Sequence, residues 1–199
     1  GGPSSGTWSF APAGVTTART SDRNYTVKVR AKDNAWPIPN PLDPTANTAT
    51  RFNVVFDTTP PVAAVHMPDE GAVYEKLLIA SGTVVADLAG LDGSNGSRVN
   101  LEIRDSNVNN VFDGDDLYWN GAAFLATVDV TTATVTGGPN GTLYWEYTTA
   151  VPYQNRQYRI TAKSYDRAGN AETTLSSATF TFNRQVPTIA LSLPAEAAS

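Results

Sequence analysis

Blocks of this sequence occur twice, in the same order. The segments around Trp8 and Tyr25 return around Trp145 and Tyr158, and each copy begins with Gly-Gly-Pro. The later matches align Phe52 with Phe180 and Pro68 with Pro194. The matching residues lie more than one hundred positions apart. A tandem repeat of that length is a whole domain and not one turn of a solenoid.

The repeat predicts how the chain divides into domains. Residues 1–59 are expected to be the C-terminal half of one domain, and residues 60–186 a complete domain. Residues 187–199 are expected to begin a following repeat, because Pro187–Leu193 matches Pro61–Met67. We therefore expect the chain to be part of a longer array.

Composition limits the classes of function. With 41% hydrophobic and 17% charged residues, the chain has enough apolar mass for a core. A net charge of −5 without a basic stripe argues against nucleic-acid binding. The absence of cysteine excludes disulfides and thiolate metal sites. No run approaches the about 20 apolar residues of a spanning helix, so we expect no direct membrane insertion.

Alternating apolar and polar residues predict an all-β fold. Val99-Asn100-Leu101-Glu102-Ile103-Arg104 has the period of two that half-buried antiparallel strands require. Strands are expected near 73–78, 79–86, 98–104, 117–119, 122–129, 143–149, 156–165 and 176–183. So many short strands favour a two-sheet sandwich of immunoglobulin type. The expected core residues are Leu101, Ile103, Trp145, Tyr158, Ile160, Ala162, Phe180 and Phe182.

Several motifs resemble bacterial immunoglobulin-like (Ig-like) tandem repeats of large secreted or cell-surface proteins. The resemblance rests on Tyr158-x-Ile-x-Ala with Asp166-x-Ala-Gly-Asn170, on the linker Asp57-Thr58-Thr59-Pro60-Pro61 and on the block Leu117–Phe124. The sequence departs from the family pattern at the insertion 36–44 and at the junction 183–187, which lacks Asp-Thr-Thr. The resemblance implies tandem Ig-like antiparallel β-sandwiches and names no ligand.

Two classes of function follow from this resemblance. The first is a structural or adhesive module, a spacer, stalk or fibre unit of a large extracellular bacterial protein, whose partners are neighbouring Ig-like repeats in the same polypeptide or polymer. The alternative is a module that recognises a cell-surface glycan or protein, such as an accessory domain of a secreted enzyme. Trp36 is the better candidate for a contact residue, although anchoring a long loop is the commoner role of such a residue. Catalysis is not expected, because His66 is the only histidine and no nucleophile motif occurs.

The segment 105–116 has the spacing of a calcium-binding loop. Calcium needs six to eight oxygen ligands, which alternate positions of a tight loop can supply. At the sixth position, Asn110 tolerates positive φ. Acidic turn geometry alone is the equally weighted alternative. The predicted ligands are Asp105, Asn107, Asn109, the carbonyl of Val111, Asp113 and Asp116.

A second cation site is conceivable at the linker. Asp57 would supply one ligand, together with Asp87, Asp92 or Asp166 if the fold brings them near. The favoured alternative is that Pro60-Pro61 alone stiffens the linker through its fixed φ.

The half domain at the start of the chain predicts an exposed apolar face. Without an opposing sheet, this face would be left uncovered, which soluble monomers rarely tolerate. We expect upstream residues to cover it or, with lower weight, the strand 187–193 of a neighbouring molecule. The residues concerned are Trp8, Tyr25, Val27, Val29, Phe52 and Val54.

Overall fold

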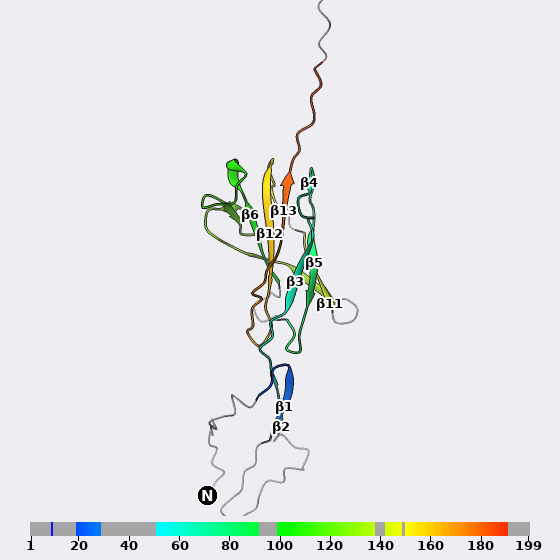
Figure 1. Cartoon of the computed structure of the whole chain (residues 1–199), viewed down its shortest axis with the longest axis vertical. Helices are drawn as coiled ribbons and strands as arrows, with labels where there is room; N and C mark the ends of the chain where they lie inside the picture. The colour runs from blue at the N-terminus through cyan, green and yellow to red at the C-terminus, as the bar shows by residue number, and fades with distance from the viewer. Residues whose placement is uncertain are drawn as a thin grey trace, which may run out of the picture.

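The computed structural model describes residues 9, 19–28, 51–91, 99–137, 142–148 and 150–190. Within these residues every regular element is a strand, apart from one 3-10 turn, η1, at Asn107–Asn109. Two sheets share one apolar core, and a separate two-stranded ribbon lies beyond one end of them (Figure 1). The predicted all-β class is confirmed.

The smaller sheet contains four antiparallel strands in the order β10-β11-β5-β3. Its central strand β5 pairs with both β3 and β11, while β3 and β10 form the edges. The strands are β3 (Val62–Met67), β5 (Ala80–Val85), β10 (Thr134–Gly137) and β11 (Thr142–Tyr147).

The larger sheet has the order β4-β13-β12-β6-β7-β8, and β9 pairs with β6 beside this path. All its pairings are antiparallel except β4 with β13, the one parallel pair among the described strands. The strands are β4 (Val73–Tyr74), β6 (Val99–Asp105), β7 (Leu117–Trp119), β8 (Phe124–Leu125), β9 (Thr131–Thr132), β12 (Arg156–Ser164) and β13 (Ser176–Phe182).

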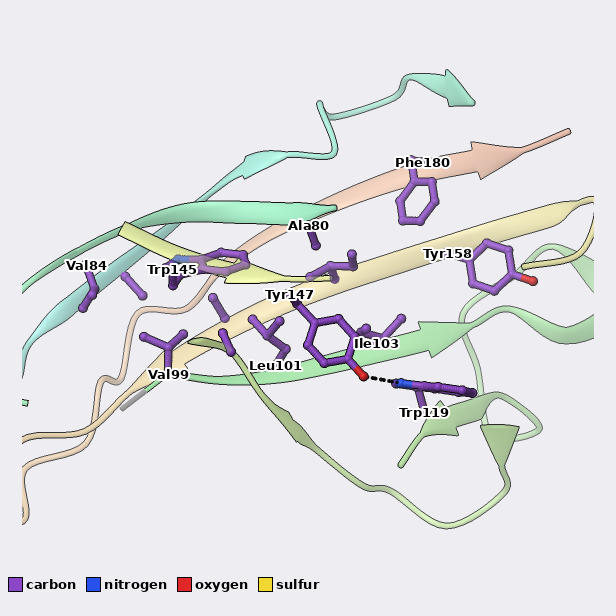
Figure 2. Close-up of a cluster of buried hydrophobic side chains, with 14 of the residues drawn as sticks. Ala80, Val84, Val99, Leu101, Ile103, Trp119, Trp145, Tyr147, Tyr158 and Phe180 are labelled. Atoms are coloured by element: carbon purple, nitrogen blue, oxygen red, sulfur yellow. Dashed lines mark hydrogen bonds between the residues drawn. The ribbon is translucent and has the colours of Figure 1, made fainter. Parts of the chain in front are cut away.

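The core lies between the two sheets and follows the predicted alternation. In β6 and β12, alternate side chains point inward and are fully buried, as Figure 2 shows for Val99, Leu101 and Ile103. Burying each such side chain contributes about 1.5–3 kcal/mol. All eight predicted core residues are buried, so the prediction is confirmed for each of them: Leu101, Ile103, Trp145, Tyr158, Ile160, Ala162, Phe180 and Phe182.

Aromatic side chains fill one end of the core. Tyr158 stacks on Phe180 with ring centroids 5.7 Å apart, and Tyr153 packs edge-on against both rings. Nearby, the buried indole Nε1 of Trp119 donates a 2.7 Å hydrogen bond to the hydroxyl of Tyr147 (Figure 2). Trp119 is therefore a packing residue of the core.

Two predicted strands differ in extent from the observed ones. The expected strand at 73–78 is only the two residues of β4, since its partner β13 ends at Phe182, opposite Tyr74. The expected strand at 122–129 is only β8, and the sequence analysis missed β9 and β10, which follow it. These strands pair over two to four residues, too few to leave a clear alternation.

The first part of the chain contributes a ribbon of β1 (Arg23–Lys28) and β2 (Arg51–Phe56). Tyr25 pairs with Val54, just as Tyr158 pairs with Phe180 in β12 and β13. The register thus matches Val54 with Phe180, which corrects the sequence alignment of Phe52 with Phe180.

An apolar face of this ribbon is exposed. Val27, Phe52 and Val54 are 44%, 54% and 42% exposed, whereas their register counterparts in β12 and β13 are buried beneath the smaller sheet. The predicted exposure is confirmed for these three residues. Tyr25 is half-buried, and Trp8 and Val29 lie outside the described residues.

The two strand pairs end in the same kind of turn. The Thr59 amide donates to Asp57 Oδ1 over 2.9 Å, and the Gln185 amide donates to Asn183 Oδ1 over 2.8 Å. At the start of each pair, a tyrosine hydroxyl accepts a backbone amide: Thr20 to Tyr25 and Gln154 to Tyr158. Both linkers therefore leave their strand pair in a similar conformation.

In the described part of the chain, no helix has the length and apolar character needed to cross a membrane.

Candidate metal centre at the linker

Asp57 fixes the linker to the sandwich. It is the first residue after β2, and its side chain is buried where the ribbon meets the larger unit. Its Oδ2 accepts the Ala89 amide over 3.1 Å, and its backbone carbonyl accepts the Asn170 side-chain amide over 3.2 Å. The loops 86–91 and 165–171 of the sandwich thus hold the linker directly.

Two further carboxylates lie at the same place. One oxygen from each of Asp57, Asp87 and Asp166 falls within 4.8 Å of the other two. Asp166 is buried and accepts both the backbone and the side-chain amide of Asn170, over 2.8 and 2.7 Å. The Asp57–Asp87–Asp166 group is called the linker cluster below.

Asp87 is the member of the linker cluster with an unused oxygen. Its Oδ1 accepts the amides of Ala89 and Gly90 over 3.0 and 3.2 Å. Its Oδ2 is shielded from solvent and has no hydrogen-bond partner among the described residues. A buried carboxylate oxygen without a partner is costly, so a proton or a cation bound there would stabilise the cluster.

The carboxylates of Asp57 and Asp87 shift each other's pKa. Burial, followed by the proximity of Asp57 and Asp166, raises the pKa of Asp87 to about 6. Burial acts to raise the pKa of Asp57 as well, but hydrogen bonds, the largest from the Thr59 amide, hold that pKa below its usual value. The pKa values of neighbouring carboxylates separate in this way because two close negative charges resist ionising together.

Asp166 begins a tight turn. The Gly169 amide donates to the Asp166 carbonyl, and Gly169 has φ +92°, which favours glycine at this position. The sequence prediction brought Asp57, Asp87 and Asp166 together; Asp92, its other candidate, lies outside the described residues. It missed Asn170 as the residue that joins Asp57 to Asp166.

The predicted calcium loop at 105–116 closes on itself. After β6 the chain forms η1, and Asn110 has φ +56°, which confirms that this position needs a residue tolerant of positive φ. Asn109 accepts the Val111 amide through Oδ1 and donates to Asp113 Oδ2 over 3.1 Å. Asn107 donates to the Asp115 carbonyl.

The carboxylates at the two ends of this loop pair with arginines. Asp105 Oδ2 accepts Arg156 Nη1 over 3.2 Å, and Asp116 forms an ion pair with Arg104. Both aspartates are buried, and burial raises the pKa of Asp105. Each therefore already has a positive partner from the larger sheet.

The exposed tip of the loop collects a different set of carboxylates. Asp113, Asp115 and Asp116 each offer an oxygen within 4.8 Å of the others, whereas Asp105 does not join them. Asp115 was not among the predicted ligands, because the twelve-position pattern passes over it. The side chain of Val111, whose carbonyl was a predicted ligand, is exposed.

Other residues named by the sequence analysis stand apart from both clusters. Trp36, proposed as a contact residue, lies outside the described residues. His66 shares a hydrogen bond of 3.0 Å with Thr83 Oγ1 on the smaller sheet. Its partner is thus a neighbouring strand residue.

No family model matches the chain, and no curated protein matches it significantly.

Proposed function

We propose that this chain is part of a structural or adhesive array of Ig-like modules in a large extracellular bacterial protein. The observation that carries the proposal is the docked linker: Asp57 accepts the Ala89 amide and Asn170 binds its carbonyl, so the connection between the two units is held on both sides. A spacer or stalk needs such a joint, because a free linker would let adjacent units rotate independently.

Likeness between the two units also supports the proposal. The ribbon β1–β2 has the strand register of β12–β13 and ends in the same turn. Its exposed apolar face corresponds to a face that the smaller sheet covers in the complete unit. We expect residues of a neighbouring repeat, in the same polypeptide or polymer, to cover it.

A calcium ion at the joint forms the second part of the proposal. The linker cluster offers three converging carboxylates, of which Asp87 Oδ2 is buried and unpartnered. Hard oxygen ligands of this kind suit Ca²⁺, which would neutralise the cluster and bind the linker to both loops. The loop 105–116 remains a predicted calcium site, where we expect weaker binding because Asp105 and Asp116 already pair with arginines.

The rigidity of the joint can be measured with two spin labels. The chain has no cysteine of its own, so Thr26→Cys in β1 and Ser177→Cys in β13 place labels uniquely on exposed sites. A narrow distance distribution between the labels is expected. A broad one would overturn the docked joint and with it the spacer role.

Calcium is tested on the same labelled protein. Added Ca²⁺ should narrow the distribution further and raise the melting temperature, and Asp87→Asn should abolish the narrowing and most of the rise in melting temperature. Asp115→Asn, at the tip of the acidic loop, is the matched control and should leave them intact. Effects lost only in Asp115→Asn would place the calcium site in the loop instead.

The recognition alternative has its own test. Binding of the chain to a glycan array would favour that alternative over the structural role.

A further inference from the structure

We propose that the complete sandwich resists being pulled apart by its ends, through a shear contact between its N-terminal strands and β13. The inference rests on the proposed structural role, since tension reaches the sandwich only if neighbouring units hold both of its ends. The contact itself is a property of this chain alone and comprises the bonds that β3, β4 and the turn before β4 make with residues 172–183.

The chain enters and leaves the sandwich at opposite ends. Pro61 leads from the linker directly into β3, and Asn183 follows directly after β13 (Figure 1). Tension along the chain therefore pulls the start of β3 in one direction and the end of β13 in the other. This tension therefore loads every bond between the N-terminal strands and β13.

The first set of bonds joins β4 and its preceding turn to β13. The Gly71 amide donates to the Thr179 carbonyl over 2.7 Å, and the Thr181 amide donates to the Ala72 carbonyl over 2.9 Å. The Asn183 amide donates to the Tyr74 carbonyl over 2.8 Å. In addition, Glu70 Oε2 accepts the Thr179 amide over 2.8 Å.

The second set joins β3 to the segment that leads into β13. The Ala63 amide donates to Glu172 Oε1 over 2.9 Å, and the Val65 amide donates to Ser176 Oγ over 3.0 Å. Both N-terminal strands are thus bonded to the last part of the chain.

The direction of these strands decides how the bonds are loaded. Since β4 and β13 are parallel, tension on the N-terminal side of one and the C-terminal side of the other slides them along each other. The bonds between them then share the load and must break together. In an antiparallel hairpin pulled at its open end, the bonds would break one at a time. Forced unfolding is governed by the unfolding rate, so this contact should set that rate.

Two exposed glutamates on either side of β4 offer a matched pair of substitutions. Glu70→Ala removes the carboxylate that accepts the Thr179 amide within the proposed shear contact. Glu75→Ala shortens a side chain that takes no part in the bonds of this contact. Single molecules of the full chain are pulled through cysteines introduced at Thr58 and Val186, both exposed.

At a fixed force, Glu70→Ala should raise the unfolding rate about tenfold, and Glu75→Ala should leave it near that of the parent chain. Equal rates for the two variants would overturn the proposal. Because the handles flank the sandwich, this result does not depend on the joint that the spin labels test.

Discussion

The indole ring of Trp145 lies directly over Gly82, its antiparallel partner on β5. A Cβ atom at Gly82 would come within 2.6 Å of two carbons of this ring and would also meet the Ala64 carbonyl. The same carbonyl accepts the Trp145 Nε1 hydrogen over 3.0 Å. The largest side chain of the core thus occupies space that only a glycine leaves free.

Gly82→Ala should therefore destabilise the sandwich by about 1–3 kcal/mol, because the added methyl group must displace the ring or the strand. Urea denaturation followed by tryptophan fluorescence measures the change. Gly137→Ala is the matched control on edge strand β10, where a Cβ meets nothing within 4 Å. Similar losses in both variants would mean that the effect comes from strand glycines in general.

Glu172 joins the two sheets as a buried acceptor. Its carboxylate accepts the Ala63 amide together with the amide and hydroxyl of Ser164, over 2.8 to 3.1 Å. Glu172→Gln replaces one accepting oxygen with an NH₂ group and should cost about 2–4 kcal/mol. The exposed Glu75→Gln should change stability little. A thermal melt of both variants is sufficient, and an unchanged Glu172→Gln would contradict this role.

Asp116 should behave as a structural residue. Its buried carboxylate pairs with Arg104, so Asp116→Asn leaves the arginine with the Asp113 carbonyl but without a negative partner and should cost about 3 kcal/mol. Asp113→Asn, at the exposed tip of the same loop, should cost far less. Chemical denaturation in excess chelator measures both without any metal contribution. If both variants lose equal stability, the ion pair is not what holds the loop.

The stability of the joint should depend on pH through Asp87. Its pKa rises from 3.8 to about 6 in the folded protein, so the folded state favours the protonated form. That contribution is complete below pH 3.8 and is lost as the pH rises through about 6. The lowered pKa of Asp57 acts in the opposite sense and loses its contribution as the pH falls.

Asp87→Asn isolates the effect of Asp87. In a chelated buffer, the parent chain should lose stability relative to this variant as the pH rises from about 4 to 7. The difference between their melting temperatures, measured across this range, gives the result. A constant difference would show that Asp87 has an ordinary pKa.

The sequence predicted the parts of the fold that are written locally. Alternation along Val99–Asp105 and Arg156–Ser164 identified long strands whose inner residues are all buried. The same reasoning failed for β9 and β10, because two and four paired residues are too few to show a periodicity. Glu172 escaped notice because its acceptor role depends on Ala63, more than one hundred residues away.

The candidate sites show the same limit. The spacing of the segment predicted Asp105 and Asp116 as calcium ligands, but in the folded protein each of them pairs with an arginine, on β12 and on β6 respectively. The sequence pattern does not show these ion pairs, because they form only when the sheet brings the arginines next to the loop. The linker sequence offered Asp57 as a cation ligand but favoured stiffening by Pro60-Pro61 alone, and the role of Asn170 required the fold of loop 165–171.

The acceptors provided by Glu172 and Ser176 also protect the protein from mispairing. β3 is an edge strand, and the Ala63 and Val65 amides would otherwise offer free donors to any similar strand nearby. Adjacent domains of like sequence are prone to exchange strands while they fold. Because its own side chains already accept these two amides, the sandwich offers a strand of a neighbouring copy few free donors at this edge.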